Sequence, residues 1–271
     1  MKNSKFFITI FLFCFTVINA NGQNSKADSL AKRHDEMMSI IMTKPKLPIK
    51  TIGILVYDGY NTLDAIGPYQ VLSQLMGVNV FFIAKEKGLI KNQRGLKVQV
   101  DKSIADVNQL DILLIPGGAA ETFKMSLDTA VLSWIRKIDK TSTYTTSVCT
   151  GAWILGASGL LKGKNATTNW YRAEEMLKRY GATFKPERWV KDGKYWTSAG
   201  VTAGMDMALG IINELMGEKY TKGVMLDMEY DPQPPYKAGS VRNTDKIVVD
   251  MMLEMYDMGL QPLIKAEDKR K

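Results

Sequence analysis

The stretch from Tyr144 to Leu155 constrains the fold of this chain more than any other. Its first half, Tyr-Thr-Thr-Ser-Val, is rich in β-branched residues without helical period, whereas Gly-Ala-Trp-Ile-Leu is typical of a buried helix. A strand that runs directly into a helix leaves one residue at the sharp turn, and here that residue is Cys149. Ser147 and Gly151 flank it with small residues, as a nucleophile elbow requires, because neighbouring backbone comes close at the turn.

A thiol at this turn would lie over the first turn of a helix, where unpaired N–H groups and the helix dipole favour an anion. Such a position can lower the pKa of a cysteine from about 8.5 to about 3.5–7.5, and the thiolate is the nucleophile. The alternative is that Cys149 is a small buried hydrophobic residue, as most free cysteines are. The elbow pattern favours the reactive thiol.

Buried strands alternate with helices from Ile52 onwards. This alternation predicts an α/β fold with a doubly wound, mostly parallel sheet flanked by helices, in which ligands gather at the carboxyl ends of the strands. The expected strands span residues 51–57, 78–84, 98–100 and 110–115; the expected helices span 63–75 and 127–138, and the first of them should bury Leu63, Ile66, Val71, Leu72 and Leu75.

Two features at this edge of the sheet could assist the thiol. Gly117 and Gly118 could bring backbone N–H groups close to an anion beside Cys149, as an oxyanion hole does, although glycine pairs also form plain turns. Asp64 is a carboxylate in an apolar context at the start of the first helix. It could cap that helix, or it could hold and pass on a proton if burial raises its pKa.

The chain has one histidine, His34, which lies in a polar segment ahead of the domain. A Cys–His dyad would need that segment to fold back onto Cys149, so Cys-His peptidase chemistry and Cys-His-Glu amidotransferase chemistry are disfavoured. Zinc sites built from Cys and His are also disfavoured, because the chain has only one histidine. We expect no metal and no cofactor.

Residues 1–22 resemble a secretory signal, with two lysines, a short apolar run and small residues at 20–22 for cleavage. The apolar run is too short for an ordinary membrane span, and a retained anchor is the alternative. Cleavage would leave Cys149 as the only cysteine, so no internal disulfide could form. We expect a secreted, periplasmic protein without stable membrane insertion.

The remaining chain divides into a mobile polar arm over 23–49 with a short helical patch, an α/β domain over 50–240, and a C-terminal helix and charged tail over 241–271. The net charge of +8 lies mainly at the ends, since residues 51–264 carry only +1. The domain therefore lacks the basic footprint of a nucleic-acid binder. The C-terminal helix, expected over 247–258, should cover the core or a dimer partner with its apolar side, which is formed by Val248, Met251, Met252, Met255 and Tyr256.

Together, several stretches of residues 50–240 resemble the ThiJ/PfpI superfamily and, within it, the isonitrile hydratase-like branch. This resemblance implies a flavodoxin-like sandwich, a homodimer and no cofactor. The stretches are Leu-Asp-Ala-Ile-Gly-Pro at 63–68, Ile-Pro-Gly-Gly at 115–118, Ser-Val-Cys-Thr-Gly at 147–151, Thr-Ser-Ala-Gly-Val-Thr-Ala-Gly-Met-Asp at 197–206 and Met-Glu-Tyr-Asp-Pro-Gln-Pro-Pro at 228–235.

In isonitrile hydratases the cysteine attacks the terminal carbon of R–N≡C, and water hydrolyses the thioimidate to an N-substituted formamide. The resemblance implies that Cys149 is the nucleophile, Asp64 the proton donor and acceptor, and Thr150 the adjacent supporting residue. Gly118 and Thr150 would supply backbone N–H groups. With Gly117 and Asn169, the site would bind a small-molecule substrate.

Two residues depart from the patterns of relatives. Peptidase-type members carry histidine where this chain has Thr150, so protease activity does not transfer. Relatives typically have histidine at the position of Asn169, which can form hydrogen bonds but cannot titrate. The same domain occurs in AraC-type regulators, but the chain after Gly239 is too short for their helix-turn-helix domain.

Two alternatives to the hydratase stay open. One is a glyoxalase- or deglycase-type enzyme in which Cys149 forms a hemithioacetal with a reactive carbonyl. The other is a non-catalytic redox-sensing or small-molecule-binding protein, in which Cys149 is oxidised to sulfinate. Asp64, together with Thr150 next to the nucleophile, favours the hydratase, since glyoxalase-type relatives generally use a glutamate and often a histidine.

Overall fold

In the computed structural model the described residues, 21–41 and 45–270, fall into two compact units divided between residues 43 and 44. The first contains helix α1 (Asn21–Ile41), which is longer than the helical patch expected in the arm and carries the exposed His34. The predicted signal, 1–22, lies outside the described residues apart from its last two. The second unit contains the α/β domain.

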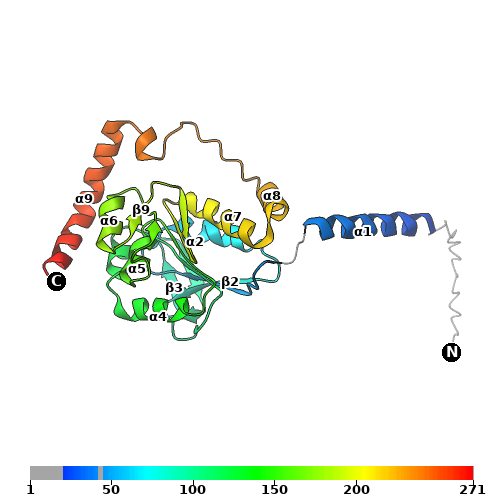
Figure 1. The fold of residues 1–271 in the computed structure, drawn as a ribbon, viewed down its shortest axis with the longest axis horizontal. Helices are drawn as coiled ribbons and strands as arrows, with labels where there is room; N and C mark the ends of the chain where they lie inside the picture. The colour runs from blue at the N-terminus through cyan, green and yellow to red at the C-terminus, as the bar shows by residue number, and fades with distance from the viewer. Residues whose placement is uncertain (1–20, 42–44, 271) are drawn as a thin grey trace, which may run out of the picture. The chain divides into compact units, whose positions relative to one another are not determined.

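The central sheet has seven strands in the described chain, and every neighbouring pair is parallel except the one at the β10 edge. The doubly wound, mostly parallel sheet expected from the sequence is thus confirmed (Figure 1). In order across the sheet the strands are β10 (Trp189–Asp192), β11 (Tyr195–Ser198), β7 (Tyr144–Val148), β6 (Ile112–Ile115), β1 (Thr51–Leu55), β2 (Asn79–Ala84) and β5 (Lys102–Ser103); two small pairs add β3 (Gly88–Lys91) with β4 (Lys97–Val100) and β8 (Asn165–Ala166) with β9 (Thr183–Phe184).

Helices cover both faces of this sheet, with α2 and α7 packed together on one side and α3, α4, α5, α6 and α9 grouped on the other (Figure 1). Among the described residues, no helix combines the length and the apolar character that a membrane crossing requires. The helices of the domain are α2 (Thr62–Leu72), α3 (Ala120–Met125), α4 (Thr129–Asp139), α5 (Gly151–Ala157), α6 (Ala173–Arg179), α7 (Ala203–Met216), α8 (Glu218–Asp227), the 3₁₀ turn Val241–Asn243 and α9 (Lys246–Asp268).

The start of α2 corrects one expectation. Leu63, predicted to be buried, is 46% exposed, whereas Asp64 is fully buried. The reason is the cap: Asn61, not Asp64, caps the helix and accepts the N–H of Leu63 at 3.2 Å. With the cap at Asn61, the next turn directs Asp64 inward at the carboxyl end of the sheet.

The C-terminal helix α9 extends ten residues beyond the expected end at Met258. Its second half covers the core, because Leu260 and Ile264 join a buried cluster that contains Phe123 and Trp153. Of the predicted apolar side, Tyr256 packs against this cluster, whereas Val248, Met251 and Met255 are exposed.

Candidate active site

Cys149 lies at the turn between β7 and α5 with a left-handed φ of +60°, which is costly for a residue other than glycine. The Cys149 N–H donates to the carbonyl of Ser198 at 3.0 Å, and Thr168 Oγ1 donates to the Cys149 carbonyl at 2.9 Å. A Cβ at Gly151 would lie 2.1 Å from the backbone oxygen of Ile115. The strand–turn–helix unit predicted from the sequence is confirmed, and the small residue after the turn is sterically required.

Asn169 contacts the sulfur directly. Its Nδ2 donates to Cys149 Sγ at 3.4 Å, while its Oδ1 accepts the N–H of Tyr171 at 3.0 Å. The Tyr171 bond fixes which end of the amide faces the thiol. The sequence suggested that Asn169 binds substrate; the structure places it as a donor to the sulfur.

Asp64 lies beside the thiol, buried at the start of α2. Its Oδ2 accepts the N–H of Gly117 at 3.1 Å, and its Oδ1 has no hydrogen-bond partner within the part of the chain that the structure describes. Burial raises the pKa of Asp64 to about 7, opposed by the Gly117 bond and by hydrogen bonding with Cys149. A carboxyl group that titrates near neutrality can exchange a proton with its neighbour.

The electrostatics of Cys149 differ from the expectation. Burial first, and the charge of Asp64 second, raise the pKa of the thiol well above its usual value, although hydrogen bonds from the Thr150 N–H and from Asn169 lower it. The helix start does supply its N–H group, but the thiolate is desolvated at 6% exposure and faces a carboxylate. Proton transfer from the thiol to Asp64 removes the negative charge of the carboxylate, which is the second of these causes. The thiol and the carboxyl group therefore titrate as a coupled pair.

The glycine pair holds the site together rather than offering free donors. The Gly117 N–H is bound to Asp64, and the Gly118 N–H donates to Thr150 Oγ1 at 3.0 Å, so neither serves as the oxyanion hole expected from the sequence. Thr150 Oγ1 in turn donates to the carbonyl of Gly118 at 2.5 Å. A Cβ at Gly117 would lie 2.6 Å from Thr150 N and 2.9 Å from Asp64 Oδ2. Glycine therefore lets α2 approach the start of α5.

The sequence did not identify two tyrosines near the site. Tyr57 hydrogen-bonds to the Pro116 carbonyl at 2.9 Å and to Thr122 Oγ1 at 2.8 Å. Tyr256 comes from α9, and its ring packs against Trp170 and Tyr171, the two residues after Asn169. Burial raises its pKa, and the charges of Cys149 and Asp64 raise it further. In the sequence Tyr256 appeared only as one member of an apolar helix face, which carries no signal of a site.

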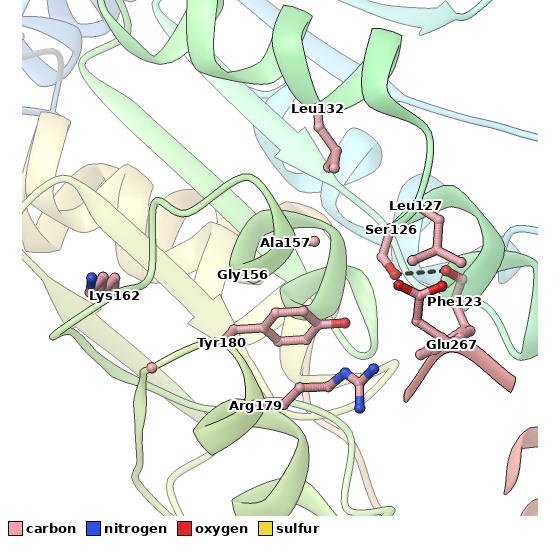
Figure 2. A pocket seen from close by; sticks show the side chains of 11 residues that line it. Phe123, Ser126, Leu127, Leu132, Gly156, Ala157, Lys162, Arg179, Tyr180 and Glu267 are labelled. Atoms are coloured by element: carbon pink, nitrogen blue, oxygen red, sulfur yellow. Dashed lines mark hydrogen bonds between the residues drawn. The ribbon is translucent and has the colours of Figure 1, made fainter. Parts of the chain in front are cut away.

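A cavity of about 530 Å³ lies at the opposite end of α5 from the thiol. Arg179 and Tyr180 line one side of this cavity, and the Tyr180 ring lies near Gly156 at the end of α5 (Figure 2). None of the residues around Cys149 lines it, so it is not the reaction site. Nowhere in residues 21–41 and 45–270 do three or more His, Cys, Asp or Glu side chains form a group that could hold a metal ion.

Known proteins resemble this chain in sequence and in fold. A family model described as DJ-1/PfpI family matches residues 50–214. The isonitrile hydratase of Pseudomonas putida is 39% identical over 199 residues, covering 73% of this chain and 86% of that protein. A deglycase of Pyrococcus horikoshii is 29% identical over 153 residues, covering 56% and 90%. The crystal structure of a ThiJ/PfpI family protein from Pseudomonas syringae matches with a TM-score of 0.76 at 33% identity, covering 82% of this chain and 91% of that chain.

Proposed function

Because this chain belongs to the DJ-1/PfpI family, we propose that it is a cysteine-dependent enzyme that hydrates an isonitrile, or a similar small electrophile, to an N-substituted formamide. The observation that carries the proposal is the pairing of the buried Cys149 thiol with a carboxyl group, Asp64, whose pKa is raised to about 7. The likeness to the Pseudomonas putida isonitrile hydratase supports the choice of substrate class.

In the first step Asp64 takes the proton of the Cys149 thiol as sulfur attacks the terminal carbon of R–N≡C. The carbon–sulfur bond forms, and Asp64 returns the proton to that same carbon, which gives the thioimidate R–N=CH–S–Cys149. Transfer within the pair avoids a free thiolate, which burial disfavours.

In the second step Asp64 is the general base for water. The water oxygen bonds to the thioimidate carbon, and one water proton passes through Asp64 to the nitrogen. The carbon–sulfur bond then breaks, the remaining hydroxyl proton returns to sulfur, and the product is R–NH–CHO. The N–H groups of Asn169 and Thr150 stabilise the departing sulfur as negative charge develops on it.

The test is formamide formation from a simple isonitrile by the wild-type protein, Cys149→Ala and Asp64→Asn. We expect turnover in the wild type and its loss in both variants. Undiminished hydration by Cys149→Ala would rule out the mechanism.

A second candidate is an enzyme that acts on reactive carbonyls, and the likeness to the Pyrococcus horikoshii deglycase favours it. A matched assay with methylglyoxal separates the two, because only this candidate consumes methylglyoxal and leaves the isonitrile unchanged. A redox sensor would turn over neither compound, and peroxide would convert its Cys149 to sulfinate.

Export to the periplasm and a homodimer are part of the same proposal. The signal-like composition of residues 1–22 supports export, and the exposed apolar side chains of α9 would suit a second copy. Cell fractionation and the mass measured in solution test these two points.

A further inference from the structure

Helix α9 lies outside residues 50–214, which the family model matches, yet it contacts the segment that carries Asn169. Tyr256 stacks on Tyr171 with ring centroids 5.3 Å apart. The next residue, Asp257, accepts a hydrogen bond from the Tyr171 hydroxyl at 2.8 Å. It also accepts two from Arg172, from Nε at 2.9 Å and from Nη2 at 2.8 Å, in the bidentate arrangement that fixes orientation most strongly.

Tyr171 and Arg172 share one turn with Asn169. The Tyr171 N–H holds Asn169 Oδ1 at 3.0 Å, and Arg172 has left-handed backbone angles, φ 44° and ψ 39°. Such a conformation is costly for arginine, so surrounding contacts must hold it. Glu175 binds the Arg172 side chain at 3.2 Å, whereas Asp257 binds the side chains of both Tyr171 and Arg172 and so joins them to α9.

We propose that Asp257 is a positioning residue: by holding Tyr171 and Arg172 it fixes the Asn169 amide with its N–H group directed at Cys149 Sγ. The inference deepens the proposed function, since the Asn169 bond matters only where sulfur carries negative charge. It is tested on the sulfur itself, so its outcome does not depend on whether isonitriles are the substrate.

Two effects of replacing Asp257 have opposite signs. The titratable groups that face the thiol are Asp64 from α2, Tyr57 from the loop after β1 and Tyr256 from α9, and all three are retained in Asp257→Asn. Removal of the negative charge alone would favour the thiolate and lower the pKa of Cys149. Loss of the Asn169 donor would raise that pKa. The direction of the shift therefore distinguishes positioning from simple electrostatics.

The experiment measures alkylation of the full chain by iodoacetamide across about pH 6 to 10, followed at Cys149 by mass spectrometry so that Cys14 does not interfere. We expect Asp257→Asn to raise the pKa of the thiol by about one unit, which makes alkylation at neutral pH about tenfold slower. Asn169→Ala should produce a similar shift. The double variant should shift no further than Asn169→Ala, because both changes remove the same interaction.

Asp268→Asn is the matched control, because Asp268 also joins α9 to an arginine of α6, at 2.5 Å from Arg179 Nη1, without contacting the Asn169 turn. It should leave the pKa of Cys149 unchanged. Tyr171→Phe removes the hydrogen bonds of the hydroxyl with Asp257 and with Gln261 but keeps the ring and the backbone N–H. It should raise the pKa by a smaller amount, and it tests the proposal even where Asp257→Asn does not fold. An unchanged or lowered pKa in both Asp257→Asn and Tyr171→Phe, or shifts that add fully to that of Asn169→Ala, would overturn it.

Discussion

The carboxyl group of Asp64 accepts the backbone N–H of Gly117 at 3.1 Å, and this bond joins the start of α2 to the loop after β6. Only one carboxyl oxygen is engaged; Oδ1 is buried without a partner in the described chain. A carboxylate in that position loses hydration that one amide does not replace, which is why the pKa of Asp64 is raised to about 7. The site therefore stores a proton near neutral pH.

This raised pKa predicts a pH-dependent stability. An unfolded aspartate titrates near 4, so between about pH 4 and 7 the folded state binds more protons than the unfolded state, and the free energy of unfolding falls as pH rises through that window. Asp64→Asn has no carboxyl group to titrate at this position, so its free energy of unfolding should not show this fall. Urea denaturation gives the free energy of unfolding of the variant minus that of the wild type. This difference should be higher at pH 8 than at pH 4 by roughly 2–4 kcal/mol. An equal difference at both pH values would contradict the buried, proton-holding carboxyl group.

The close approach of the Ile115 backbone to Gly151 predicts that a larger residue at position 151 will destabilise the protein. A Cβ at position 151 would lie 2.1 Å from a backbone oxygen, and backbone cannot move aside as a side chain can. We expect Gly151→Ala to lower the free energy of unfolding by about 3 kcal/mol or more, measured by denaturant titration. Gly223→Ala in α8 is the control, because its Cβ would meet nothing within 4 Å; it should be neutral or stabilise by up to about 1 kcal/mol. Equal effects of the two substitutions would argue against the tight turn.

The hydrogen bonds of Thr150 predict that its substitution by valine and by serine will affect stability and turnover differently. Its Oγ1 accepts the Gly118 N–H at 3.0 Å and lies 3.2 Å from Thr122 Oγ1, all in buried surroundings. Thr150→Val keeps the shape but leaves the Gly118 amide unpaired, so we expect a loss of about 1–3 kcal/mol in stability together with reduced turnover. Thr150→Ser keeps the hydroxyl and should remain close to wild type. Thermal melting and kcat measured on both variants check this, and indistinguishable variants would refute the bridging role.

The sequence predicted those parts of the fold that depend on local pattern. The elbow at Cys149 was recognisable because β-branched residues give way directly to a helix opening, and β1, β2 and β6 because continuous apolar runs bounded by turns mark buried parallel strands. Val71, Leu72 and Leu75 are buried as predicted, but Leu63 is exposed in the first turn of α2 after the Asn61 cap, because periodicity alone cannot choose between Asn61 and Asp64 as the cap.

The chemistry at the thiol was less accessible to sequence reasoning, because it depends on contacts between distant segments. The pKa of Cys149 rises rather than falls, since burial and Asp64 outweigh the helix start, and burial of one sulfur is a property of the assembled core. The position of Tyr256 beside Trp170 and Tyr171 depends in the same way on how α9 packs. No local pattern in residues 246–268 distinguishes that contact from ordinary core packing.

The proposed mechanism depends on a covalent bond between Cys149 and the substrate carbon. The most direct measurement is mass spectrometry of protein mixed with excess isonitrile and quenched during turnover. We expect a thioimidate on the peptide that contains Cys149, heavier by the mass of one isonitrile, which decays as formamide accumulates. Formamide that accumulates at the wild-type rate from Cys149→Ala, with no adduct on any peptide, would contradict it.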